Sequence, residues 1–107
     1  MTAIYLVKVE VAPSAERAWD DWNTKHHIPD VLAQPGFARA SKYRLDACAP
    51  DGWSRYWVLY ELESRAALDA YLSGEAVKRL RADHASRFAD TTRLSREILE
   101  PVARVEK

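Results

Sequence analysis

The pattern of hydrophobic and polar residues predicts β-strands in four stretches of the chain. The period of two is clearest near the start, where Tyr5, Val7 and Val9 stand at every second position. The predicted strands cover residues 3–11, 37–46, 53–63 and 92–105. In the second stretch the alternation places Phe37 and Arg39 on one face. The chain therefore has the pattern of a four-stranded sheet.

Helical periodicity follows the first predicted strand. Apolar residues recur there at three- and four-residue steps, and the resulting stripe carries Trp19, Trp22 and His26 toward the sheet. On this stripe, His26 is predicted to be a packed structural histidine. Pro29 disfavours helical geometry at the residue before it, so the helix is expected to break or kink close to His27.

Two further helical stretches lie between the third and fourth predicted strands. Ser64 is suited to cap the first of them, and Gly74 separates it from the second, which carries Leu80 and His84 on its apolar stripe. The order of elements is then strand, helix, strand, strand, helix, strand. This is the split βαβ pattern of a ferredoxin-like α+β domain with an antiparallel sheet.

The third predicted strand is apolar on both faces. Residues 56–60 read Tyr-Trp-Val-Leu-Tyr, whereas the helices of a ferredoxin-like domain cover one face of the sheet only. Each large side chain left in water forfeits about 1.5 to 3 kcal/mol, which exceeds what a surface ion pair restores. A second copy of the same sheet is the simplest cover. Residues 1–107 are therefore predicted to form one domain that assembles as a homodimer.

Composition and charge narrow the choice of partners. The chain has 16 basic and 16 acidic side chains, so no net field attracts it to nucleic acid or to a membrane surface. Cys48 is the single cysteine, and no apolar stretch has the length of a membrane span. These features favour a cytoplasmic protein that binds neither nucleic acid nor membrane.

Two groups of residues carry the motifs of a known superfamily. The first group is Trp22-Asn23-Thr24-Lys25-His26-His27-Ile28-Pro29, Pro35-Gly36-Phe37 and Tyr43-Arg44, and the second is Leu80-Arg81-Ala82-Asp83-His84, Arg87-Phe88, Tyr60 and Tyr71. The first resembles the helix-to-strand segment of the dimeric α+β barrel superfamily, whose EthD-like members have a similar His-x-Pro and Pro-Gly-Phe layout. The second resembles an uncharacterised family of short bacterial proteins in that superfamily.

This resemblance implies a fold and a pocket location more than an activity. Members of the superfamily include isomerases, cyclases, cofactor-free monooxygenases and haem-degrading enzymes. His27 matches the histidine of the His-x-Pro segment, which in enzymes of this type acts as a proton-transfer group at a cavity between helices and sheet. An imidazole titrates near neutral pH, which suits that role. His27 is the candidate catalytic residue, its other role being to bond a carbonyl freed at the kink, and the resemblance leaves open whether His26 or His27 faces the cavity.

Five further side chains are candidates to bind a substrate. They are Arg39, Tyr43, Trp57, Tyr60 and His84. A phenol or a guanidinium group orients a carbonyl or carboxylate group, and a histidine on the last helix can approach the first helix across the same cavity. Core packing or a dimer contact is the other role open to each of them.

Three functions remain open at this point. The first is proton transfer by His27 on a small aromatic or ketone-bearing molecule without a cofactor. The second is a non-catalytic dimer that binds a ligand or a partner protein. The third is haem or metal binding, although adjacent histidines on a helix point about 100° apart, which does not suit a shared metal ion. No set of metal ligands is predicted.

Overall fold

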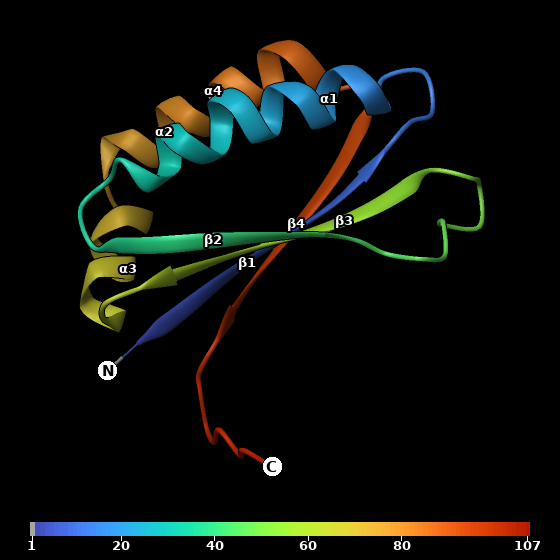
Figure 1. Cartoon of the computed structure of the whole chain (residues 1–107). Helices are drawn as coiled ribbons and strands as arrows, with labels where there is room; N and C mark the ends of the chain where they lie inside the picture. Colours follow the sequence, from blue (N-terminus) through green and yellow to red (C-terminus); the bar gives the residue numbers. More distant parts are fainter. Residues whose placement is uncertain (1) are drawn as a thin grey trace.

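The computed structural model describes residues 2–107, which fold into an antiparallel sheet with helices on one of its faces (Figure 1). The strands are β1 (Ala3–Val11), β2 (Phe37–Arg44), β3 (Ser54–Leu62) and β4 (Thr92–Leu99). They lie in the order β2-β3-β1-β4. The helices are α1 (Glu16–Trp22), the π-helical turn η1 (Asn23–His27), α2 (Ile28–Leu32), α3 (Arg65–Leu72) and α4 (Glu75–Phe88). The predicted α+β class, element order and four-stranded antiparallel sheet are confirmed.

The first helical segment runs on without a break from α1 through η1 into α2. The backbone of both His27 and Ile28 has right-handed helical torsion angles, and the Ile28 N–H donates to the Asn23 carbonyl five residues earlier. Pro29 lies in the first turn of α2, where its missing N–H is tolerated. The predicted break is therefore absent, and the irregularity expected close to His27 takes the form of a π-turn within a continuous helix.

The π-turn changes which histidine faces the sheet. An extra residue in one turn rotates the following side chains, so the inward position moves from His26 to His27. The side chain of His26 is exposed, whereas the ring of His27 stacks on that of Trp22 with 4.9 Å between the centroids. The prediction of a packed His26 is wrong for this reason.

A β-bulge near the start of β2 separates two residues that were expected to share a face. Phe37 pairs with Leu62 and Arg39 pairs with Glu61, with a shift of register between them. Phe37 consequently lies on the helix side, where its ring meets that of Tyr71 edge-on at 4.9 Å. Arg39 lies on the opposite side and forms a 3.0 Å ion pair with Glu61.

The last strand is shorter than predicted. β4 ends at Leu99, two residues before Pro101, and the remaining residues are exposed and have no regular structure. Figure 1 shows this terminal segment running away from the helices. Because proline cannot donate to a strand partner, pairing stops here instead of continuing to residue 105.

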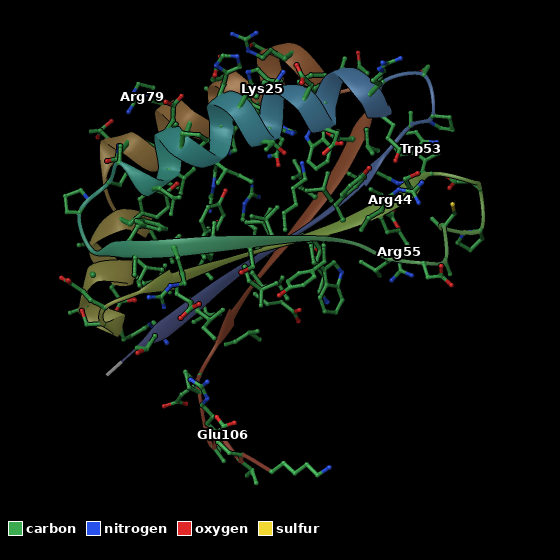
Figure 2. The ribbon with its side chains drawn as sticks, in the orientation of Figure 1. Lys25, Arg44, Trp53, Arg55, Arg79 and Glu106 are labelled. Carbon is green, nitrogen blue, oxygen red and sulfur yellow. The ribbon has the colours of Figure 1, made fainter. Side chains whose placement is uncertain are left out.

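The two faces of the sheet have different cover. Alternation along β3 places Tyr56, Val58 and Tyr60 against the helices, where they are buried, and Trp57 and Leu59 on the other face, where they are partly exposed. Figure 2 shows side chains projecting from both faces, with the helices of residues 2–107 on one of them. As expected from the sequence, the helices cover one face of the sheet and leave apolar side chains on the other.

Gly36 fixes the turn between α2 and β2. Its φ angle is +86°, and a Cβ atom there would lie 2.5 Å from the Cβ of Ala67. We expect Gly36→Ala to lower the free energy of unfolding by roughly 2–5 kcal/mol, since backbone strain adds to overpacking. Gly52 has a φ of +90° and open space around it, so Gly52→Ala is a control that isolates the strain. Urea denaturation measures both variants, and equal losses would contradict the packing argument.

Candidate functional site

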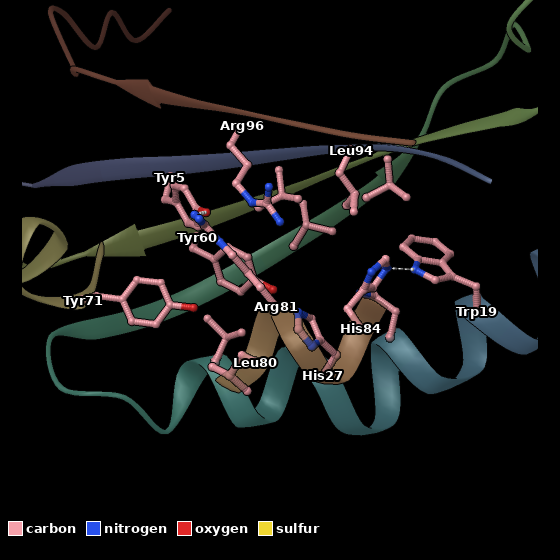
Figure 3. Close-up of a pocket in the computed structure, with 15 residues that line it drawn as sticks. Tyr5, Trp19, His27, Tyr60, Tyr71, Leu80, Arg81, His84, Leu94 and Arg96 are labelled. Atoms are coloured by element: carbon pink, nitrogen blue, oxygen red, sulfur yellow. Dashed lines mark hydrogen bonds between the residues drawn. The ribbon is translucent and has the colours of Figure 1, made fainter. Parts of the chain in front are cut away.

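A narrow cavity of about 40 Å³ lies between the sheet and the helices (Figure 3). It is lined by Tyr5, Val7, Val9, Trp19, Asn23, His27, Val31, Val58, Tyr60, Tyr71, Leu80, Arg81, His84, Leu94 and Arg96. The volume has room for a few water molecules but not for a bulky ligand unless flexible side chains move. Both histidines of the lining project from helices toward the sheet.

The cavity opens toward the edge of the sheet formed by β4. Among its lining residues, only Arg81, Leu94 and Arg96 are exposed, and these lie on α4 and β4. The two arginine side chains are long and flexible, so their movement can widen the entrance at little cost. The entrance is therefore positively charged, although the whole chain has a net charge of zero.

His84 is held by a buried hydrogen bond. The indole Nε1–H of Trp19 donates to Nε2 of His84 at 3.2 Å. Burial, together with the neighbouring His27, lowers the pKa of His84 to about 4. The ring is therefore neutral at pH 7, and because Nε2 accepts a bond, the ring proton is placed on Nδ1.

His27 faces His84 across the end of the cavity. The centroids of the two rings are 6.0 Å apart. Burial lowers the pKa of His27, against the opposing influence of Asp30 and Asp83. Within residues 2–107, its buried Nδ1 atom has no hydrogen-bond partner. A neutral imidazole with an unpaired ring nitrogen is able to accept or share a proton.

Asn23 adds a second unpaired polar group to the cavity wall. The residue is only 3% exposed, and its Oδ1 atom has no hydrogen-bond partner in the described chain. It belongs to the π-turn and lies four residues before His27. An unpaired buried acceptor is costly, by about 1–3 kcal/mol. A ligand that carries a donor would recover part of that energy.

Tyrosine rings form the other end of the cavity. The rings of Tyr60 and Tyr71 each lie 6.2 Å from that of Tyr5, measured between centroids. Arg81 donates to the Tyr5 hydroxyl at 3.0 Å. Burial raises the pKa of Tyr60 far above its usual value and that of Tyr71 to about 12. Both phenols therefore remain protonated and can donate hydrogen bonds.

Two of the five residues predicted to bind a substrate line the cavity, and three do not. Tyr60 and His84 line the cavity with His27. Arg39, Tyr43 and Trp57 project from the opposite face of the sheet, so their prediction as part of the same pocket is wrong. The reason is the two-residue period of a strand, which sends neighbouring side chains such as Trp57 and Val58 to opposite faces.

Three polar lining residues were missed from the sequence. Asn23 and Arg81 stand within the segments that carry the resemblance but were given no binding role, and Arg96 was not singled out on the last predicted strand. The spacing of Trp19, Asn23 and His27 at steps of four residues is the signal that was available for Asn23. For Arg96, the signal was its position two residues after Leu94 on one face of the last strand.

The described residues contain neither a cluster of metal ligands nor a helix suited to span a membrane. Residues 2–107 bring together no group of three or more His, Cys, Asp or Glu side chains that would hold a metal ion. No helix in this part of the chain is long and apolar enough to cross a membrane.

The buried histidine makes stability depend on pH. The pKa of His84 is about 4 in the folded chain against an ordinary value of 6.5, so the unfolded chain binds more protons between these values. Stability is then fully present above pH 6.5 and falls as the pH falls toward 4, by at most about 3 kcal/mol. We expect His84→Asn to flatten this part of the profile in urea denaturation. Parallel profiles for the two proteins would contradict this expectation.

A family model described as "Domain of unknown function (DUF4286)" matches residues 2–102. No curated protein sequence matches the chain. The family match covers nearly the whole length of the chain, including every residue that lines the cavity.

Solved structures share the fold at low sequence identity. An EthD family protein from Bacillus halodurans has a TM-score of 0.67 and 17% identity, covering 94% of this chain and 99% of its own. HapK from Hahella chejuensis has a TM-score of 0.70 and 16% identity, covering 100% and 98%. SnoaB from Streptomyces nogalater, a cofactor-independent oxygenase, has a TM-score of 0.64 and 14% identity, covering 98% of each chain. These similarities show the dimeric α+β barrel fold.

Proposed function

The chain belongs to the DUF4286 family, with the dimeric α+β barrel fold, and we propose that it binds a small aromatic or ketone-bearing molecule and transfers a proton with His27 without a cofactor. The observation that carries the proposal is the neutral, inward-facing ring of His27 at the end of a cavity between helices and sheet. The description of one structural neighbour as a cofactor-independent oxygenase is consistent with such chemistry.

The cavity offers a group for each part of a proton transfer. His27 removes a proton from the carbon beside a carbonyl group, and the electron pair of that C–H bond moves to the carbonyl oxygen. The Nδ1–H group of His84 and the guanidinium groups of Arg81 and Arg96 stabilise the negative oxygen. Return of the proton to the enolate regenerates His27, so the step needs no oxidant or reductant.

The working unit in this proposal is a homodimer of single-domain subunits. The apolar side chains on the uncovered face include Leu6, Trp57 and Leu59, which neighbour one another across β1 and β3. Packing two such faces together is the arrangement that gives the fold its name, and it leaves the helix-side cavity of each subunit intact. The predicted binding role of Arg39, Tyr43 and Trp57 becomes, in this view, contact between subunits.

Proton exchange tests the proposed activity directly. The purified protein is incubated in D₂O with an aromatic ketone, the methyl ester of phenylpyruvate, and loss of the signal of the protons beside the ketone is followed by NMR. We expect exchange faster than in buffer at equal pH, because His27 supplies a positioned base. Exchange at the buffer rate over a panel of aromatic ketones would rule out the catalytic proposal.

The small volume of the cavity favours a second candidate, a non-catalytic ligand-binding dimer. About 40 Å³ is far below the volume of an aromatic ligand, so Arg81 and Arg96 have to move before one can enter. Binding of an aromatic ketone without accelerated exchange would select this second function. The two candidates therefore share a site and differ in what His27 does there.

A further inference from the structure

We propose that the ligand of this cavity is an organic anion with a carboxylate group, and that Arg96 is the residue that selects it. This inference rests on the proposed function, because it names the chemical class of the ligand at the same site. The entrance then selects for negative charge on the ligand, which the neutral groups inside the cavity do not do.

The polar side chains that a ligand meets at the entrance are both arginines. The exposed lining there is made by one leucine and two arginines, on the edge strand β4 and on α4. Arg96 stands opposite Val7 in the sheet, on the helix side, and Figure 3 shows it extending into the space between the sheet and the helices. A carboxylate gains a paired, charge-assisted hydrogen bond from a guanidinium group at such a position, whereas a cation is repelled.

Arg96 differs from the arginine three residues earlier on the same strand. Arg93 lies on the other face of the sheet and is paired with Glu10 at 2.8 Å and with Asp51 at 2.7 Å. Within residues 2–107, Arg96 forms no ion pair of this kind. A guanidinium group that lines a cavity and has no acidic partner in the described chain is free to bind the carboxylate of a ligand.

Two charged side chains of α4 near the entrance leave the charge of Arg96 in place. Asp83 on α4 is paired with Arg87 at 3.2 Å. Arg81 is engaged with the neutral hydroxyl of Tyr5 and keeps its positive charge. With a carboxylate on Arg96, the rest of a short ligand extends inward toward His27 and His84, which is where the proposed proton transfer takes place.

A matched pair of probes tests the charge of the ligand. Phenylpyruvate and its methyl ester share the aromatic ring and the ketone, but only the first has a carboxylate. Binding of each is measured by isothermal titration calorimetry to the wild type and to three variants: Arg96→Gln, Arg96→Lys and Arg79→Gln. Arg79 is an exposed α4 residue that points away from the sheet, so its variant matches the loss of charge without touching the cavity.

We expect the wild type to bind phenylpyruvate at least tenfold more tightly than the ester, a difference of about 1.4 kcal/mol. Arg96→Gln should remove this preference, Arg96→Lys should keep part of it, and Arg79→Gln should keep all of it. Equal binding of the two probes, no millimolar binding of either, or an unchanged preference in Arg96→Gln would overturn the inference. Selective binding of phenylpyruvate without proton exchange would uphold it while removing the catalytic function, and exchange of the ester without selectivity would do the reverse.

Discussion

Replacement of His27 by alanine is expected to reduce proton exchange on an aromatic ketone by a factor of about 10²–10⁴, the range in which a positioned general base contributes. The imidazole is the only group in the proposed step that removes the proton, so the loss should fall on the catalytic rate constant. Binding should change little, because Arg96 and His84 remain. The measurement is the NMR exchange assay at saturating ketone, with wild type and variant at the same pH.

The fold should survive this replacement. The ring of His27 contributes its stacking on Trp22, but its buried Nδ1 lacks a partner in the described chain, so removing it also removes an unpaired polar atom. We expect a loss of about 1 kcal/mol, or a shift of a few degrees in the melting temperature. His26→Ala is the matched control, since this exposed neighbour carries the same ring outside the cavity. Equal exchange rates in the two variants would assign His27 a structural role.

Much of the fold was predictable because hydrophobic periodicity is a local property of the sequence. The alternation at Tyr5, Val7 and Val9 and the cap at Ser64 depend only on nearby residues, and both are present in the structure. The bulge beside Phe37 and the π-turn before Pro29 were not predictable in this way. Each inserts one residue into a regular element, and its position depends on packing against distant residues.

One of those insertions, the π-turn, explains the error about the two histidines, and the other errors about the site have different causes. The π-turn exchanged the positions of His26 and His27 relative to the helical stripe, and the resemblance matched His27 to the His-x-Pro segment without deciding which of the two rings faces the cavity. Trp57 was chosen because aromatic residues suit a pocket, but the sequence does not say which face of a strand meets the helices. Arg96 could not be distinguished from a solvated arginine, since its role depends on β4 lying at the open edge of the cavity.

Introduction of a charge on the uncovered face of the sheet is expected to dissociate the proposed dimer. Leu59 lies at the middle of this face, opposite Leu6 on β1 and Ser41 on β2. In a face-to-face dimer, Leu59→Glu would bury a carboxylate without a partner, at a cost of several kcal/mol. A cost of about 4 kcal/mol weakens association about a thousandfold. Analytical ultracentrifugation should therefore report twice the 12.2 kDa chain mass for the wild type and the single chain mass for the variant.

A control variant and a check of folding make this experiment specific. Ala82→Glu adds the same charge at an exposed position of α4, in the helix layer, and should leave the dimer unchanged. Circular dichroism shows whether Leu59→Glu retains its helices and strands, because a monomer that has unfolded says nothing about the interface. A wild type that sediments as a single chain, or a folded Leu59→Glu that remains dimeric, would mean that the apolar side chains of β1 and β3 are not covered by a second sheet. The physical reason for expecting the dimer is that Trp57 and Leu59 are partly exposed to water in the single chain, and full exposure of such a large apolar side chain forfeits about 1.5 to 3 kcal/mol.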